Sequence, residues 1–215
     1  MRIFIIFCLS ILLMPAMAWS SVMNGGFEDD FTGWTTGGNT AVVTQATVDG
    51  ITIDPFGGDK MASLTYPAMT GFIFDNFIYQ DVVLTEGDNW LSFRYNFWTF
   101  DEAPFDNPGF TVSVNNETKF SVAAGDIGDG TPGTLDYTDW QLINIDVSEY
   151  YSEDCTRPAT IRLAFNAGNT GDKHFPSGVF IDQADLTANA VPLPGAVWIL
   201  GAGLAGLLGL RRQNR

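Results

Sequence analysis

The strongest constraint on the fold is the alternation of side chains along residues 90–98, WLSFRYNFW. Successive side chains of a β-strand point to opposite faces, so one face of this segment would be apolar and the other mixed. The apolar face holds Leu91, Phe93, Tyr95 and Phe97. The mixed face holds Trp90, Ser92, Arg94, Asn96 and Trp98. A strand that needs a core on one side only is typical of antiparallel sheets.

Seven further segments have the composition of strands. Each is rich in β-branched and aromatic residues, and Gly, Asn, Asp and Pro clusters separate them. They cover residues 40–47, 60–66, 77–84, 110–114, 141–147, 161–167 and 178–186. Together the segments predict an all-β chain folded as an antiparallel β-sandwich, with a β-barrel as the alternative.

Residues 1–18 have the composition of a secretory signal peptide. Arg2 precedes an apolar run, and Pro15 leads into Ala16-Met17-Ala18, an A-x-A cleavage pattern. The apolar run is too short to cross a bilayer, which disfavours a retained anchor. We therefore expect cleavage after Ala18 and a single domain over residues 19–189.

This domain is strongly acidic. It holds all 25 Asp and Glu residues of the chain and six of its ten Lys and Arg residues, a formal net charge of −19. Such a surface repels phosphate, which excludes nucleic acid as a partner. Cys155 is the one cysteine left after removal of the signal peptide, so no internal disulfide is expected.

No recognisable catalytic constellation is present in the sequence. The single histidine, His174, lies in a loop-like segment, and a zinc site needs several His or Cys ligands. A pair of carboxylates for glycan hydrolysis is compatible with the composition, but no particular pair stands out. We expect a non-enzymatic protein, with a secreted glycan hydrolase as an alternative.

The opening of the domain, NGGFEDDFTGW (24–34), resembles the start of jelly-roll carbohydrate-binding modules and related galactose-binding-like domains. The segment VFIDQADL (179–186) is similar to their closing strand. The resemblance implies a jelly-roll sandwich whose first and last strands meet around a structural calcium ion. The implied ligands are Glu28, Gly58, Asp59, Lys60 and Asp182. On the alternative interpretation, Glu28 and Asp182 are exposed acids at strand ends.

A glycan-binding surface needs aromatic rings beside hydrogen-bonding groups. The mixed face of residues 90–98 offers both, and outward residues of 161–167 would extend it if they lie on the same sheet. The predicted site comprises Trp90, Arg94, Asn96, Trp98, Arg162 and Asn166. A loop lying over the tryptophans would remove this platform, and we expect Trp34 to pack into the core. A second acidic cluster with Asp101, Glu102 and Asp106 favours a turn over another cation site.

The last segment, residues 190–215, has the pattern of a membrane-directed tail. An uncharged apolar stretch is near the lower length limit of a spanning helix, which we place at about 195–210, and arginines follow it. Arginines at this position predict a cytoplasmic end and an acidic domain outside the cell. The motif residues are Val191, Pro192, Leu193, Pro194, Trp198, Arg211 and Arg212.

This tail resembles the PEP-CTERM class of sorting signals in its Val-Pro-Leu-Pro variant, and Leu193 stands where the commonest form has Glu. The resemblance implies processing by a membrane exosortase in a Gram-negative bacterium, after transient anchoring in the inner membrane. A plain single-pass anchor is the alternative. We predict an exported protein that binds or is embedded in extracellular polysaccharide, or else a structural or adhesive matrix protein without a specific glycan site.

Overall fold

The computed structural model describes residues 22–66, 76–85, 87–103, 107–129, 131–150, 159–168 and 175–188. Its strands form two antiparallel sheets and a separate hairpin. The five-stranded sheet has the order β1 (Thr35–Gly37), β6 (Asn76–Val83), β12 (Thr160–Gly168), β8 (Gly109–Val114), β9 (Glu117–Ala123). The six-stranded sheet has the order β10 (Asp136–Tyr137), β7 (Trp90–Thr99), β13 (Ser177–Thr187), β5 (Met61–Tyr66), β2 (Thr40–Val43), and β11 (Gln141–Asp146) also pairs with β7. The hairpin joins β3 (Ala46–Val48) and β4 (Ile51–Ile53).

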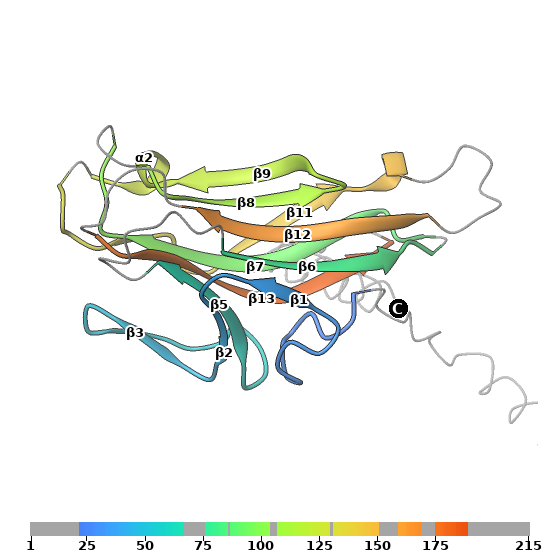
Figure 1. Ribbon diagram of the computed structural model, residues 1–215, viewed down its shortest axis with the longest axis horizontal. Coiled ribbons are helices and arrows are strands. Elements are labelled where there is room, and N and C mark those ends of the chain that lie inside the picture. Colours follow the sequence, from blue (N-terminus) through green and yellow to red (C-terminus); the bar gives the residue numbers. More distant parts are fainter. Residues whose placement is uncertain are drawn as a thin grey trace, which may run out of the picture.

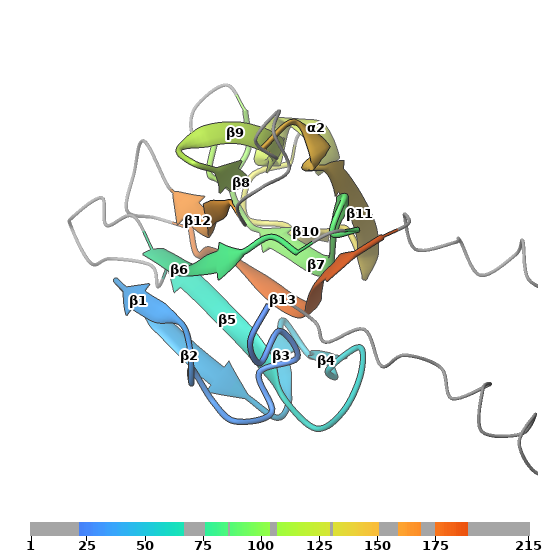
Figure 2. The same ribbon diagram turned by 90° about the vertical axis from the view of Figure 1, so that its right-hand side faces the viewer.

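The two larger sheets lie face to face as two layers (Figures 1 and 2). Rings from the two sheets meet between them: Phe93 on β7 packs edge-on against Phe165 on β12, with centroids 5.1 Å apart. Tyr95 on β7 lies 5.5 Å from Phe110 on β8. The predicted apolar face of residues 90–98 is wholly buried in this core. The all-β sandwich is therefore confirmed, because the described strands form separate sheets rather than one closed barrel.

Most predicted strands are present with shifted ends, but residues 40–47 are divided between β2 and β3. The prediction missed β1, β4, β9 and β10. Strand β9 follows a turn in which Asn115 and Asn116 have φ values of 51° and 67°. Two consecutive positive φ values suit a tight hairpin turn, and paired Asn residues are a readable signal for one. The strand was not predicted because Glu117 and Lys119 interrupt its apolar pattern. Charged residues are present there because the strand lies at the edge of its sheet and is partly exposed.

A second apolar cluster covers part of the outer face of the six-stranded sheet. Trp98 is only 7% exposed, and it belongs to a cluster with Phe180 and Met61 from the neighbouring strands β13 and β5. The hairpin residues Val48 and Ile53 complete this cluster. The prediction that Trp98 forms part of an exposed platform is therefore wrong, because the β3–β4 hairpin lies over that part of the sheet.

Arg162 and Asn166 lie on β12, which belongs to the five-stranded sheet. They are thus not on the sheet of β7, contrary to the prediction. The Arg162 guanidinium donates two hydrogen bonds to Asp81, at 2.7 and 2.8 Å, and lies 4.2 Å from the ring centroid of Tyr79. Its partners are therefore neighbours on the same outer face, because Arg162 and Asp81 are opposite each other in the β12–β6 register.

Two short helical segments complete the described elements, α2 (Ala124–Ile127) and η2 (Ser148–Tyr150). Within the described ranges no helix is long and apolar enough to span a bilayer. The predicted signal peptide, the tail from residue 190 with its sorting motif and helix, and Cys155, His174 and Asp106 lie outside these ranges.

Candidate functional site

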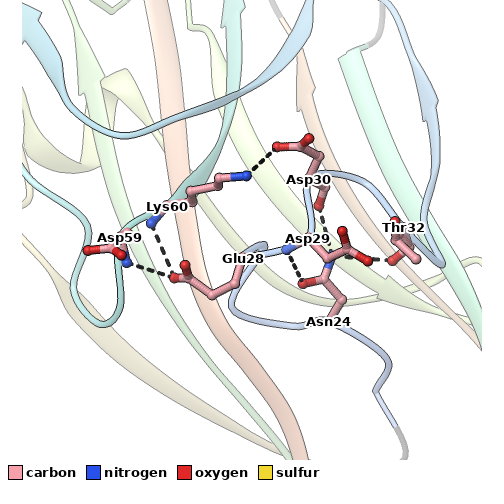
Figure 3. Close-up of polar contacts among 7 residues, drawn as sticks. All are labelled: Asn24, Glu28, Asp29, Asp30, Thr32, Asp59 and Lys60. Carbon is pink, nitrogen blue, oxygen red and sulfur yellow. Dashed lines mark hydrogen bonds and ion pairs between the residues drawn. The ribbon is translucent and has the colours of Figure 1, made fainter.

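The opening motif of the domain forms a tight loop organised by Asn24 (Figure 3). The Asn24 side-chain amide donates to the carbonyl of Asp30 at 2.8 Å, and its Oδ1 accepts the N–H of Asp29 at 3.1 Å. The Asn24 carbonyl accepts the indole N–H of Trp34 at 3.2 Å. Trp34 is 7% exposed and packs against Phe27 and Phe165, so its predicted core position is confirmed. Asn24 therefore has a structural role in this motif.

Gln80 holds the opening loop against β6. Its Oε1 accepts the N–H of Met23 at 2.7 Å, and its Nε2 donates to the carbonyls of Met23 and Gly33 at 3.0 Å each. The side chain is 6% exposed. Gln80 was not among the predicted site residues, although a Gln between the inward-facing Ile78 and Val82 of an alternating strand is a visible signal.

The residues predicted to bind calcium come together at one loop: Figure 3 shows Glu28, Asp59 and Lys60, and Asp182 contacts the same loop. Oε1 of Glu28 accepts the N–H groups of Asp59 and Lys60 at 2.8 and 3.2 Å. Oδ2 of Asp182 accepts the N–H of Gly57 at 2.9 Å, and its Oδ1 accepts that of Gln183 at 2.7 Å. The Lys60 ammonium lies 2.8 Å from Asp30. Hydrogen bonds from one loop thus link the opening and closing motifs.

This loop depends on Gly58. Its φ of 67° lies in the left-handed region, and a Cβ added there would overlap the carboxylate of Glu28. A glycine is required because the loop backbone must approach the carboxylate closely to donate its N–H groups.

The groups around Glu28 and Asp182 are only partly suitable as calcium ligands. Carboxylate oxygens are suitable calcium ligands, but the loop presents N–H groups to them where calcium takes carbonyl oxygens. Within the described residues, no three His, Cys, Asp or Glu side chains gather as a metal site. Burial raises the pKa of Asp182, hydrogen bonds from three backbone N–H groups oppose that rise, and the charge of Glu28 adds to it. Calcium binding at these residues stays a prediction.

Two clefts open on the outer face of the six-stranded sheet. The first, of about 490 Å³, lies between the opening segment and β7, and we call it the Arg94 cleft. It is lined by Val22, Asn24, Gly25, Gly26, Ser92, Arg94, Leu142, Gln183, Ala184 and Asp185. The second, of about 280 Å³, is the aromatic cleft. It is lined by residues 51–56, Asn96, Tyr137, Asp139 and Trp140. Both volumes are close to those of small-ligand sites.

The lining of the aromatic cleft contains two exposed rings and one partly exposed ring that is held in place. Phe56 and Tyr137 are 43% and 40% exposed, and they come from separate segments of the chain. Trp140 packs edge-on against Phe56 with centroids 6.2 Å apart, and its indole N–H donates to the carbonyl of Asp54 at 3.1 Å. Rings that are fixed yet exposed offer flat apolar surface to a ligand at little cost in side-chain entropy.

Arg94 connects the two clefts. It lines the first, and its guanidinium lies 3.5 Å from the centroid of Phe56, which lines the second. Burial lowers the pKa of Arg94, and the charge of Asp182, its register partner on β13, raises it. Among the residues named in the two linings Arg94 is the only basic one, and the charged remainder is acidic.

The predicted binding residues therefore fall into three groups. Arg94 and Asn96 line the clefts, and Trp90 is partly exposed on the same strand. Trp98 is buried, and Arg162 and Asn166 lie on the other sheet. The rings that do form the cleft were missed: they are Phe56, Tyr137 and Trp140. Their signal was aromatic residues inside turn-rich segments, although Trp140 also packs against the second apolar cluster.

The second predicted acidic cluster is used for turn and strand-end contacts. The N–H of Asp101 donates to the hydroxyl of Thr99 at 2.9 Å, and its Oδ2 accepts the hydroxyl of Ser177 at 3.1 Å. Asn107 accepts the N–H of Gly125 at 2.9 Å. These contacts agree with the turn interpretation of the cluster.

No family model matches this chain, and no curated protein matches it. The structural neighbours include carbohydrate-binding modules with a β-sandwich fold. CBM27-1 of Caldicellulosiruptor saccharolyticus, solved in complex with mannohexaose, has a TM-score of 0.48 at 11% identity, over 78% of this chain and 97% of that module. CBM28, a non-crystalline cellulose specific module, has a TM-score of 0.42 at 14% identity, over 78% and 95%.

A third neighbour is the enzymatically active domain of bacteriophage CBA120 tailspike protein 4, with a TM-score of 0.37 at 12% identity. It matches 77% of this chain, but this chain spans only 21% of that one. At these identities the likeness concerns the fold alone, so what this chain binds has to be inferred from its own residues.

Proposed function

We propose that this protein is a non-enzymatic glycan-binding protein that holds a polysaccharide chain in the aromatic cleft. The observation that carries this proposal is the pair of exposed rings, Phe56 and Tyr137, beside the fixed Trp140 and Arg94. Large exposed rings around a concavity are unfavourable in water unless a ligand covers them. Sugar rings suit this site, because their C–H faces stack on aromatic rings while their hydroxyls find polar groups at the rim.

The test uses the full chain and gels or resins that carry purified polysaccharides. Phe56→Ala and Tyr137→Ala each remove one stacking partner, which is worth about 1–2 kcal/mol, or roughly fivefold to thirtyfold in affinity. Val83→Ala is the matched control, because Val83 is 46% exposed but lies on β6 in the other sheet.

Retention that is lost in the two aromatic variants and kept in the control supports the proposal. Equal retention of all four proteins would instead favour a structural or adhesive protein without a specific glycan site. Product released from the polysaccharide would favour the glycan hydrolase.

We further propose export and sorting through the two ends of the chain. The support is the sequence: a signal peptide over residues 1–18 and a tail over 190–215 that resembles the exosortase-processed class. The acidic domain would then work at the cell surface or in the extracellular polysaccharide of a Gram-negative bacterium. Cell fractionation with intact-mass measurement tests this, since a mature protein that keeps both ends would contradict it.

Calcium bound by Glu28 and Asp182 is part of the same proposal, as a structural ion. The support is that the two carboxylates are close enough for Glu28 to raise the pKa of Asp182. A divalent cation relieves repulsion of this kind. Binding would require the 57–60 loop to exchange its N–H contacts for oxygen ligands.

A further inference from the structure

Asn96 lies at a gap in the six-stranded sheet. Strand β11 pairs with β7 as far as Tyr95, and β10 begins to pair at Trp98. Asn96 thus has a register partner on β13, Phe180, but none on the side of β10 and β11. Asn96 is also part of the lining of the aromatic cleft, so the break in strand pairing lies beside that cleft.

The turn beside the gap is firmly built. Thr138 accepts the N–H of Phe97 on its hydroxyl at 3.0 Å, and its own N–H donates to the carbonyl of Phe97 at 2.9 Å. Asp139 has a φ of 53°, which turns the chain sharply before Trp140. The break in strand pairing at Asn96 is therefore part of the fold.

The side-chain carbonyl of Asn96 is buried without a hydrogen-bond partner. Among the described residues only two buried side-chain atoms are in this state, Oδ1 of Asn96 and Nε1 of Trp98. Asn96 is 2% exposed and lines the aromatic cleft, whereas Trp98 is not in its lining. An unpaired buried acceptor destabilises a fold, and it is explained when a ligand supplies the missing donor.

We propose that Oδ1 of Asn96 accepts a hydrogen bond from a hydroxyl of an uncharged sugar unit held by Phe56 and Tyr137. Asn96 is then the specificity-determining residue of the cleft, and its ligand class is neutral glycans. This inference rests on the proposed glycan-binding function.

The charges around the cleft select against acidic sugars. Asp54 and Asp139 line it, and its lining contains no basic residue among those described. The Arg94 guanidinium lies over Phe56, and Arg94 is opposite Asp182 in the strand register. A uronate carboxylate would meet the like charges of Asp54 and Asp139, and it has no hydrogen to donate to the unpaired Oδ1 of Asn96.

The test measures the full chain and two variants against defined hexasaccharides. The neutral probes are mannohexaose, cellohexaose and xylohexaose, and the acidic probe is hexagalacturonate. Asn96→Leu keeps the number and branching of the side-chain heavy atoms and removes the unpaired acceptor. Asn166→Leu is the matched control, since Asn166 is a partly exposed Asn on a strand of the other sheet.

We expect the wild-type chain to bind a neutral probe and to bind hexagalacturonate more weakly. Asn96→Leu should weaken neutral binding by roughly tenfold to a hundredfold. Its melting midpoint without glycan should stay equal or rise, because no internal hydrogen bond is lost. Asn96→Ala, which cannot overpack the floor, provides the same comparison if the Leu variant does not fold.

Three results would overturn the inference while leaving glycan binding intact. They are undiminished binding by both Asn96 variants, tighter binding of hexagalacturonate, and a fall in the melting midpoint of both variants that exceeds the cost of altered packing, which would show an internal partner for Asn96. Failure of the wild-type chain to bind any probe, or any polysaccharide, would overturn the proposed function itself.

Discussion

Trp98→Ala tests whether the tryptophan of β7 is a core residue or a binding platform. The side chain is 7% exposed, packs edge-on against Phe100 at 6.2 Å, and lies in the cluster under the β3–β4 hairpin. Truncation of a buried aromatic to Ala costs about 3–5 kcal/mol, from lost burial and the cavity left behind. For a domain of this size that corresponds to a fall of roughly 6–20 °C in melting temperature.

The assay is thermal unfolding of the full chain followed by near-UV circular dichroism, with glycan retention measured below the transition. Trp90→Ala is the matched control, because Trp90 is a partly exposed tryptophan on the same strand. Gly178→Ala perturbs the same packing from the other side, since its Cβ would lie 2.9 Å from Cζ2 of Trp98. Overpacking of that kind costs about 1–3 kcal/mol.

A Trp98→Ala protein that melts like wild type and loses glycan retention would refute this reasoning. It would mean that the hairpin does not cover the ring in solution and that the platform predicted from the sequence is the correct interpretation. A large fall in melting temperature, with little change for Trp90→Ala, would establish the second cluster as part of the folded core.

Three further perturbations test the links between the chain ends and the sheets. Gln80→Met removes three hydrogen bonds at nearly constant side-chain shape. We expect the free energy of unfolding, measured in urea, to fall by about 2–4 kcal/mol. An unchanged urea midpoint would contradict the role of Gln80. Calcium should raise the melting midpoint relative to chelator, and Glu28→Gln should remove the difference; equal midpoints for wild type would rule out the proposed ion. With chelator present, burial raises the pKa of Asp182 above 3.8, so ionising this carboxyl costs more free energy in the folded chain than in the unfolded chain. The stability of wild type relative to Asp182→Asn should therefore fall as pH rises through that raised pKa, and parallel pH profiles would argue against it.

Much of the sandwich could be predicted from local pattern. Alternation along residues 90–98 and 161–167 identified the faces that became the core, since Leu91, Phe93, Ile161 and Phe165 are fully or almost fully buried. The opening and closing motifs also predicted that Glu28 and Asp182 would approach the same loop. The predictions from alternation succeed because the period of a strand is fixed by its covalent geometry, whereas the approach of Glu28 and Asp182 was implied by the resemblance of the two motifs.

The binding surface could not be predicted in the same way. Alternation shows that Trp98 points away from the core, but not that the β3–β4 hairpin, some fifty residues earlier in the chain, lies over it. It likewise shows that Arg162 points outward, but not which sheet its strand joins. The aromatic cleft needs residues 51–56, Asn96 and residues 137–140 from three separate segments.

The sequence by itself therefore determined which side of each strand is apolar, the acidic character of the domain and the motifs at its two ends. Tertiary structure decided which outward side chains reach solvent, which rings gather into a cleft, and where the sheet leaves Asn96 without a partner. The physical reason is that side-chain direction is a local property of the backbone. Exposure, by contrast, depends on long-range strand pairing and on whatever segment packs on top.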